Sequence, residues 1–354
     1  MSWSPCVGPL TYGHLMVDPA ETTSIRLTEL TSCGGCAAKW GASLLRDLLD
    51  GQERPADPTA LLVGLAPFDD AAVVQLSDEV GLVSTTDFFP PLVDDPDDYG
   101  AIAAANACSD VFAMGGDVVL ALNVAAFPED LDPAVISHIF ASAARVVREA
   151  GGVIAGGHTI RAPEPIFGLA VQGVVRPGAQ LTKGGARPHD ALVLSKPLGT
   201  GIALASGDEE AVAAAIRGMR QLNRDAATAL RARASAIHAV TDVTGFGLAG
   251  HAWEMAERSS TVLVIDADLL PAYPGVAAAA ERGVRTGGDA RNRAYVEGHV
   301  TIAVPDSQAA LAFDPQTSGG LLAAVDPAAI DGLAAAGFIR IGRVEAGRAA
   351  IELR

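Results

Sequence analysis

The sequence has few cysteines and no long hydrophobic run, and each shortage excludes a class of protein. Four cysteines in 354 residues are too few for a disulfide scaffold, so we expect reduced thiols with chemical roles and a cytoplasmic location. No apolar stretch approaches the roughly 20 residues that a membrane helix needs, and the N-terminus has no basic segment followed by an apolar one. No membrane partner is therefore expected.

Basic residues are also scarce. The chain has 25 lysines and arginines against 42 aspartates and glutamates, which gives a net charge of −17. A surface that binds nucleic acid must neutralise its phosphates, so this charge argues against a nucleic-acid partner. Magnesium prefers oxygen ligands, usually one or two carboxylates together with the phosphates of a substrate. The excess of aspartate fits a magnesium nucleotide site, although an acidic solvated surface remains the alternative for any one aspartate.

The length and the hydrophobic content of 49% are sufficient for two domains. Residues 1–58 lack sustained periodicity and predict a flexible leader that carries three cysteines and a lysine. Strand-like and helix-like segments alternate over residues 59–177 and again over residues 178–354, with a glycine-, proline- and arginine-containing linker at residues 176–190. The pattern predicts two α+β domains after the leader.

Aspartates follow the first apolar runs. The segments LLVGLAPFDDAAVVQL and GLVSTTDFFPPLVDD predict strands whose ends carry Asp69, Asp70 and Asp87. The segment DDYGAIAAANACSDVFAMGG predicts a helix with Asn106 and Asp110 one turn apart on one face. Later segments predict two more strands, a helix and a closing strand, IFGLAVQGVV, in the same domain.

Three glycine-containing segments predict turns at strand or helix ends. No P-loop motif occurs, so a nucleotide needs another cradle. The candidates are AGGHT, TGFG and DPQTSGG, since backbone amides in such turns can bind phosphate oxygens. An ordinary turn is the alternative for each of them.

The segment GFGLAG, residues 245–250, matches the dinucleotide-binding pattern G-x-G-x-x-G. A helix-like segment and a strand ending at Asp266 follow it, as in a dinucleotide fold. The preceding AVTDVT is short and polar, however, and the hydrophobic first strand of that fold is not evident. Nicotinamide or flavin binding is therefore the disfavoured alternative.

The stretch SCGGCAAKWG, residues 32–41, places Cys33 and Cys36 two residues apart and Lys39 three residues after the second cysteine. Lysine occurs at only two other positions, Lys183 and Lys196. A zinc site normally needs four ligands, and no second pair is in view. Two interpretations of this stretch stay open: a reversible disulfide between the two cysteines, or a reactive thiolate beside the Lys39 ammonium group.

Seven blocks, in order, carry a resemblance to a known family. The chain resembles the selenophosphate synthetases, also called selenide, water dikinases, of the aminoimidazole ribonucleotide synthetase-like superfamily; the blocks are SIRLTEL, DDAAV, STTDFF, NACSDVFAMGG, AGGHTIRAPEPIFGLAV, TDVTGFGLAGH and DPQTSGGLL. The resemblance implies two α+β domains, each a mixed β-sheet packed by helices, in a homodimer. It also implies that ATP, selenide and water give selenophosphate, AMP and orthophosphate, with Mg2+ as cofactor.

The resemblance also implies site residues. The family's active cysteine or selenocysteine corresponds to Cys36 and its essential lysine to Lys39, both as catalytic residues. Its metal ligands correspond to Asp70, Asp110 and Asp242. Its nucleotide contacts correspond to Lys39, Asp69, Asp87, Asp110 and the phosphate-binding turn Gly157, His158 and Thr159.

Two other hypotheses stay open at this stage. The chain could be another ATP-dependent enzyme of the same superfamily, or a thiol-disulfide or selenium-binding protein in which Cys-Gly-Gly-Cys is the whole function. A selenium-donor protein is a possible partner of the enzyme. We also expect the leader from about Ser24 to Pro58 to be poorly ordered without nucleotide and to fold over the site when magnesium-ATP binds, with Lys39 contacting the phosphates. Cys108, in an alanine-rich helix, is expected to be a buried small hydrophobic residue.

Overall fold

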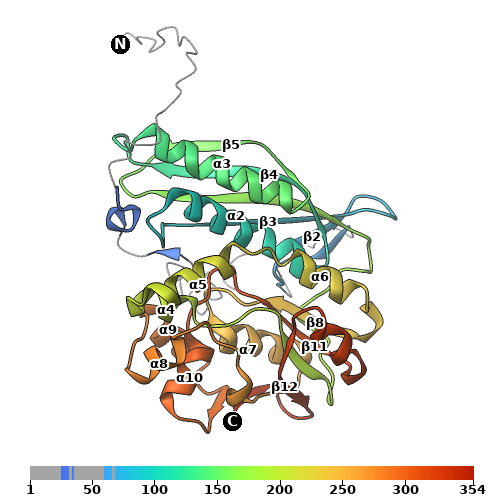
Figure 1. Ribbon diagram of the computed structural model, residues 1–354. Coiled ribbons are helices and arrows are strands. Elements are labelled where there is room, and N and C mark those ends of the chain that lie inside the picture. Colours follow the sequence, from blue (N-terminus) through green and yellow to red (C-terminus); the bar gives the residue numbers. More distant parts are fainter. Residues whose placement is uncertain (1–24, 32–33, 36–59, 66–67) are drawn as a thin grey trace, which may run out of the picture.

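Two β-sheets with helices packed against them make up the computed structural model of the chain (Figure 1). It describes residues 25–31, 34–35, 60–65 and 68–354. The predicted leader therefore lies mostly outside the described residues. No helix in the described part of the chain is both long and apolar enough to cross a membrane.

The first sheet has six strands in the order β1-β2-β3-β6-β4-β5. Only β4 and β5 run parallel, so the sheet is mixed. Its strands are β1 (Leu61–Val63), β2 (Ala72–Gln75), β3 (Gly81–Phe89), β4 (Asp117–Phe127), β5 (Val153–Arg161) and β6 (Ile166–Val175). The predicted strand over LLVGLAPFDDAAVVQL is thus two short antiparallel strands, and Asp69 and Asp70 lie in the loop before β2 rather than at the end of a strand.

Two helices, α2 (Pro96–Ala113) and α3 (Pro133–Glu149), pack together on one face of this sheet (Figure 1). Helix α2 begins where the sequence provides a cap, because Asp95 accepts a hydrogen bond from the backbone N–H of Asp98 and Pro96 occupies the first turn. Fourteen of its residues are buried, Cys108 among them, so the expectation for that cysteine is confirmed.

The second sheet has seven strands in the order β10-β13-β9-β12-β7-β11-β8. The pairs β10–β13 and β13–β9 are parallel and the others antiparallel. Its strands are β7 (Ala191–Leu194), β8 (Ile237–Asp242), β9 (Val262–Ile265), β10 (Val300–Ile302), β11 (Leu321–Val325), β12 (Ile339–Glu345) and β13 (Ala350–Leu353). The prediction of α+β architecture with mixed sheets is confirmed.

Helices of the second half surround this sheet and extend toward α2. They are α4 (Thr200–Ser206), α5 (Glu209–Arg220), α6 (Arg224–Arg231), α7 (Gly247–Ser259), α8 (Val276–Glu281), α9 (Gly287–Tyr295), α10 (Asp306–Phe313) and α11 (Ile330–Ala334). Short 3-10 turns complete the elements: η1 (Leu27–Leu30), η3 (Ala234–Ala236), η4 (Ala267–Leu269) and η5 (Pro327–Ala329).

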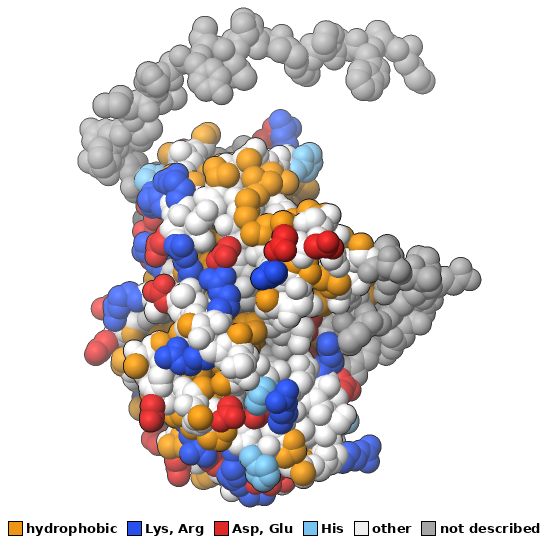
Figure 2. Space-filling model, turned by 90° about the vertical axis from the view of Figure 1, so that its right-hand side faces the viewer, with side chains coloured by type: hydrophobic (Ala, Val, Ile, Leu, Met, Phe, Trp, Pro, Cys, Tyr) orange, Lys and Arg blue, Asp and Glu red, His pale blue; other side chains and the backbone are white. Residues whose placement is uncertain are grey.

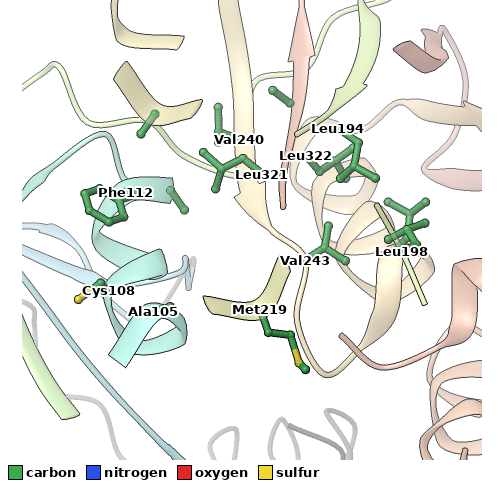
Figure 3. Packing of buried hydrophobic residues seen from close by; sticks show 14 of the residues in the cluster. Ala105, Cys108, Phe112, Leu194, Leu198, Met219, Val240, Val243, Leu321 and Leu322 are labelled. Atoms are coloured by element: carbon green, nitrogen blue, oxygen red, sulfur yellow. The ribbon is translucent and has the colours of Figure 1, made fainter. Parts of the chain in front are cut away.

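One hydrophobic core joins the two halves of the molecule, and α2 runs through it. Phe112 and Ala105 on α2 face the region of Val240, Leu321 and Met219 from the second half (Figure 3). The contacts of α2 with α5 and β8 on one side and with β3 and β6 on the other place it between the sheets. The first and second halves are therefore packed against each other, and residues from both can meet at the ends of α2.

Candidate active site

Three carboxylates meet where α2 passes between the two sheets. Asp70 comes from the loop before β2, Asp110 from α2 and Asp242 from the last position of β8. One oxygen atom of each lies within 4.8 Å of the others. These are the three residues that the resemblance assigns to the metal, and two of them come from the first half of the chain and one from the second.

The partners of these carboxylates leave two oxygens free. Asp70 Oδ1 accepts hydrogen bonds from Thr241 Oγ1 at 2.9 Å and pairs with Lys183 Nζ at 3.0 Å. Among the described residues, no hydrogen-bond partner reaches the buried Asp70 Oδ2 or the buried Asp242 Oδ2. Two orphaned carboxylate oxygens in one acidic cluster fit a bound divalent cation, since magnesium prefers ligands of this kind.

Burial and mutual repulsion raise the pKa values of two carboxyl groups in this cluster. Burial, and then the charges of Asp242, Asp87 and Asp70, raise the pKa of Asp110 well above its usual range. A 2.5 Å hydrogen bond from Thr85 Oγ1 opposes that rise without cancelling it. Burial and the neighbouring Asp70 raise the pKa of Asp242 to about 6. A divalent cation bound there would relieve the repulsion among the carboxylates.

Asp87 lies on β3 and connects the site to the second half of the chain. Its Oδ2 accepts a hydrogen bond of 2.7 Å from Asn106 Nδ2, one turn before Asp110 on α2. Asn106 Oδ1 in turn accepts the backbone N–H of Ser318 at 2.9 Å. The expected placement of Asn106 and Asp110 on one helix face is therefore observed, and both side chains point to β3.

The side chain of Asp69, which the resemblance assigns to the nucleotide, is buried. Its side chain is 0% exposed and approaches a nitrogen of Arg258 at 3.7 Å. Its oxygens accept the backbone N–H groups of Lys183 at 3.0 Å and of Asp70 at 3.0 Å. Burial, and then the charge of Asp70, raise the pKa of Asp69 to about 7. In this arrangement Asp69 holds the segment around Lys183 against the first domain.

Lys183 contacts the carboxylate cluster, which the sequence reasoning missed. Its ammonium group lies 3.0 Å from Asp70 Oδ1 and 2.8 Å from Glu254 Oε2, and its side chain is 6% exposed. Burial alone would lower the pKa of Lys183, but these two carboxylates outweigh burial and raise it well above its usual range. Lysine is rare in this chain, and one of its three lysines lies in a stretch that was interpreted as a linker. That unusual placement is the signal that could have identified Lys183.

The predicted phosphate-binding turn at Gly157, His158 and Thr159 is not a turn. All three residues lie inside β5, paired in parallel with Asn123, Val124 and Ala125 of β4. Gly157 has φ +150 and a Cβ there would lie 2.3 Å from the carbonyl oxygen of Asn123, so the glycine is required by an extended strand with a register shift.

The same three residues are exposed and lie away from the carboxylates of their own chain. Strand β5 is the edge of the first sheet, and β6 and β4 separate it from β3, where Asp87 lies. At about 4.8 Å between neighbouring strands, three steps across the sheet amount to roughly 14 Å. The structure thus brings Asp70, Asp87, Asp110 and Asp242 together and leaves these three residues at the sheet edge.

The other two glycine segments are turns, as predicted. TGFG connects β8 to α7, and DPQTSGG connects α10 to β11. In the second segment Ser318 has φ +49, an uncommon conformation for a residue with a side chain, and its carbonyl accepts a hydrogen bond from Lys196 Nζ at 2.8 Å.

The dinucleotide interpretation of GFGLAG fails on topology. The segment IHAVTD does form a buried strand, β8, so the expectation that the first strand is missing was wrong. In a dinucleotide fold, however, this strand and the one after the helix are parallel and close together. Among the described strands, β8 pairs only with β11, and β9 lies on the far side of β12, β7 and β11 in the sheet.

The predicted catalytic residues Cys36 and Lys39 lie outside the described residues, as does Cys33. The glycine pair between the cysteines is described. The Gly35 backbone N–H donates to the carbonyl oxygen of Pro90 at 2.9 Å, and a Cβ on Gly34 would lie 2.3 Å from the carbonyl oxygen of Pro91. The pair is therefore docked against the loop that follows β3.

Family models match both halves of the chain. The model "AIR synthase related protein, N-terminal domain" matches residues 68–175, and "AIR synthase related protein, C-terminal domain" matches residues 187–353. The four carboxylates of the site are thus divided between two matched domains.

Curated relatives are similar over most of their length. A selenide, water dikinase of Myxococcus xanthus is 44% identical over 342 residues, which cover 93% of this chain and 97% of the relative. A selenide, water dikinase of Pseudomonas straminea is 43% identical, with 91% and 94% covered. One from Clostridioides difficile is 39% identical, with 85% and 88% covered.

Solved structures share the fold at low sequence identity. A structure described as AaThiL complexed with AMPPCP and TMP has a TM-score of 0.66 at 22% identity and covers 94% of this chain and 96% of its own. Hydrogenase maturation protein HypE in complex with ATP has a TM-score of 0.59 at 20% identity, with 84% and 87% covered.

Proposed function

The chain belongs to the selenide, water dikinase family of AIR synthase-related proteins, and from this premise we propose that it uses ATP, selenide and water to make selenophosphate, AMP and orthophosphate. The observation that carries the proposal is the meeting of Asp70, Asp110 and Asp242 in a chain 39–44% identical to named dikinases. The fold also suits the substrate, because a structural neighbour, HypE, is described in complex with ATP.

Asp70, Asp110 and Asp242 are the residues that would hold Mg2+, and Asp87 the adjoining nucleotide. The orphaned oxygens of Asp70 and Asp242 support this assignment. Bound there, Mg2+ would neutralise negative charge on the triphosphate and polarise its phosphoryl groups. The chain's own residues orient the carboxylates: Lys183 and Thr241 hold one oxygen of Asp70, and Thr85 holds Asp110.

The chemistry consists of two transfers at phosphorus. In the first, selenium of hydroselenide forms a bond to the γ-phosphorus while the bond between that phosphorus and the β,γ-bridging oxygen breaks, leaving selenophosphate and ADP. In the second, water attacks ADP, the bond between the β-phosphorus and the bridging oxygen breaks, and AMP and orthophosphate remain. We assign Lys39 to the phosphates by its charge and Cys36 to selenium by its thiolate, whose formation the neighbouring ammonium favours.

We also propose that the enzyme is a homodimer formed through the open face of the first sheet. The helices α2 and α3 cover one face, while the opposite face carries exposed large apolar side chains at Phe88, Leu122, Val153, Ile160 and Val174. Hydrophobic side chains gather on the part of the surface that belongs to this domain (Figure 2). An exposed apolar face beside the uncovered edge strand β5 suits a second copy of the chain.

A dimer of this kind would give Gly157, His158 and Thr159 a role. They are exposed on β5, roughly 14 Å across the sheet from the strand that carries Asp87, by the strand spacing given above. At a dimer interface these residues could contact the nucleotide of the partner subunit instead of their own. This arrangement would reconcile their assignment to the nucleotide with their position.

Phosphorus NMR of an anaerobic incubation with Mg-ATP tests the proposal. With selenide, we expect selenophosphate, AMP and orthophosphate in equal amounts. ADP as the final nucleotide would instead indicate another ATP-dependent enzyme of the superfamily, and no nucleotide turnover would favour a thiol-disulfide or selenium-binding protein. An Asp242→Asn variant serves as the control that lacks one metal ligand.

A further inference from the structure

Lys196 is a buried lysine that has no part in the site described above. It follows β7 and is 4% exposed. In the sequence it lies between Leu194 and Leu198, whose buried side chains belong to the same core cluster as Val243 (Figure 3). An ammonium group is costly to bury, and burial lowers the pKa of Lys196 to about 7. An apolar residue of similar size would fill this position at a lower cost, so the ammonium group needs another explanation.

The ammonium group of Lys196 holds the backbone in two places. Its Nζ donates a hydrogen bond to the carbonyl oxygen of Ser318 at 2.8 Å and another to that of Gln221 at 2.6 Å. Ser318 belongs to the DPQTSGG turn and has φ +49, a left-handed conformation that residues with a side chain rarely adopt. Lys196 therefore fixes the carbonyl group of a residue whose backbone is strained.

The two glycines after Ser318 allow the turn to lie close to Lys196 and to the end of β8. A Cβ on Gly319 would lie 2.1 Å from the carbonyl oxygen of Val243, and a Cβ on Gly320 would lie 2.5 Å from the backbone nitrogen of Lys196. Neither position has room for a side chain. The turn is thus packed closely between the segment that carries Lys196 and the end of β8.

Ser318 connects Lys196 to a carboxylate of the candidate active site. The backbone N–H of Ser318 donates to Asn106 Oδ1 at 2.9 Å, and Asn106 Nδ2 donates to Asp87 Oδ2 at 2.7 Å. Lys196 and Asn106 therefore hold the two backbone polar groups of one residue. If the conformation of Ser318 changed, its N–H would no longer face Asn106, and the amide of Asn106 would lose a contact that orients it toward Asp87.

A separate set of hydrogen bonds joins the same turn to Asp242. Asn223 Nδ2 donates to the carbonyl oxygen of Gly319 and to Ser109 Oγ, both at 2.8 Å. A hydrogen bond from the Ser109 side chain opposes the rise in the pKa of Asp242. These contacts hold the turn on α2 without Lys196, so the loss of Lys196 should affect Asp87 more than Asp242.

We infer that Lys196 is a positioning residue of the nucleotide site, which orients Asp87 through Ser318 and Asn106. The inference rests on the proposed function, in which Asp87 adjoins the nucleotide, and adds to it a residue that touches neither substrate. Lys196 acts through hydrogen bonds and not through its charge, because its ammonium group donates to backbone carbonyl oxygens.

The first test removes the ammonium group at nearly constant volume. Lys196→Met should weaken the binding of a non-hydrolysable ATP analogue with Mg2+ about tenfold in isothermal titration calorimetry, the effect of one lost hydrogen bond from a charged group. During turnover, the KM for ATP should rise by a similar factor while the KM for selenide stays within about twofold. A general loss of structure would change both constants.

The second test restores the turn without restoring the lysine. Glycine adopts positive φ without strain, and the Ser318 hydroxyl has no hydrogen-bond partner in the described part of the chain. Ser318→Gly added to Lys196→Met should therefore return the affinity for the ATP analogue to within about threefold of wild type. Ser260→Gly is the matched control, because Ser260 has φ +53 at the exposed end of α7, away from the site. Added to Lys196→Met, it should restore none of the affinity.

Circular dichroism and thermal unfolding verify that each variant is folded, and Lys196→Leu is a second apolar variant with the same expected result. Wild-type affinity in a folded apolar variant would overturn the inference. A loss that Ser318→Gly does not restore would mean that Lys196 does not act through Ser318, and equal recovery with Ser260→Gly would mean that it only stabilises the fold; each would overturn the inference. The same holds if both apolar variants unfold and Ser318→Gly does not restore folding.

A different result would contradict the proposed function itself. Wild-type protein that binds no ATP analogue, or that makes no selenophosphate from selenide and ATP, would overturn that function whatever the variants of Lys196 do.

Discussion

Replacing Lys183 with methionine should destabilise the protein by leaving two buried carboxylates without their counter-charge. The ammonium group lies 3.0 Å from Asp70 and 2.8 Å from Glu254, whose side chains are 3% and 2% exposed. Methionine fills a similar volume without the charge. The decrease in the free energy of unfolding therefore reports the electrostatic role of Lys183 more than its packing.

The expected loss is about 3 kcal/mol. Removing one partner of a buried ion pair costs about 3–5 kcal/mol. The lower end applies because each carboxylate keeps other contacts: Asp70 accepts a hydrogen bond from Thr241, and Glu254 accepts one from Tyr295 Oη at 3.4 Å and lies 3.5 Å from His251 Nδ1. At about 2–4 °C per kcal/mol, the melting temperature should fall by roughly 6–12 °C.

Thermal and urea unfolding of the metal-free protein, followed by circular dichroism, measure this effect. Arg176→Met is the matched control, because Arg176 pairs with Glu79 at 3.4 Å on the surface with both side chains more than 70% exposed. That control should cost less than about 1 kcal/mol. Adding Glu254→Gln to Lys183→Met should restore part of the stability, since it removes one of the two unpaired charges.

Two results would refute this reasoning. If Lys183→Met cost no more than Arg176→Met, the buried ammonium group would not be compensating Asp70 and Glu254. If Glu254→Gln added to the loss instead of reducing it, the loss would come from packing rather than from charge.

The remaining predictions concern binding, assembly, the thiols and pH. Asp242→Asn should weaken Mg-ATP binding at least about tenfold without changing the circular dichroism, as measured by isothermal titration calorimetry; unchanged affinity would contradict the metal site. Phe88→Glu should convert the proposed homodimer to monomer in analytical ultracentrifugation, and a persisting dimer would place the interface elsewhere. Cys36→Ser should abolish most selenide-dependent turnover while Cys33→Ser spares it; equal losses would favour a disulfide mechanism. The folded protein holds a proton on Asp314, whose pKa burial raises to about 7, while the unfolded chain releases it near pH 4, so this group's contribution to stability falls as pH rises through that window. Asp314→Asn should therefore flatten the decline in urea stability between about pH 4 and 7, and an identical pH profile would contradict this assignment.

The assignment of these carboxylates to a metal stays a prediction, but part of their arrangement could be predicted from short-range signals. Helical spacing placed Asn106 and Asp110 on one face, and the structure turns that face to β3. The meeting of Asp110 with Asp242, 132 residues later in the sequence, was implied only by the family resemblance. No local pattern carries information about such a distant contact.

Lys183 and Glu254 were missed for the same physical reason. The two residues are 71 positions apart, and their ion pair exists only when α7 packs beside the segment that joins the domains. The glycine-containing stretch around Lys183 has the composition of a linker. Its composition carries no information about what Lys183 contacts in the folded protein. Burial of its ammonium group is a property of the folded protein alone.

The error at Gly157 shows where residue preference misleads. Two consecutive glycines favour a turn, because glycine adopts positive φ without strain. Here the same freedom serves a strand: Gly156 and Gly157 have φ +146 and +150, and the register of β5 against β4 shifts beside them. Gly156 and Gly157 allow β5 to approach β4 closely and do not reverse the direction of the chain.

The division of the carboxylate cluster between two domains bears on how the protein is made. A growing chain that has folded only its first sheet carries Asp70, Asp87 and Asp110 but has neither Lys183 nor Asp242. Such a nascent chain lacks both the carboxylate of Asp242 and the Lys183 ammonium group that pairs with Asp70. If the cluster holds Mg2+ as proposed, this chain has no complete metal site, and we expect no ATP turnover before β8 has been synthesised and docked against α2. A truncated chain that ends before β8 is likewise expected to be inert rather than a wasteful ATPase.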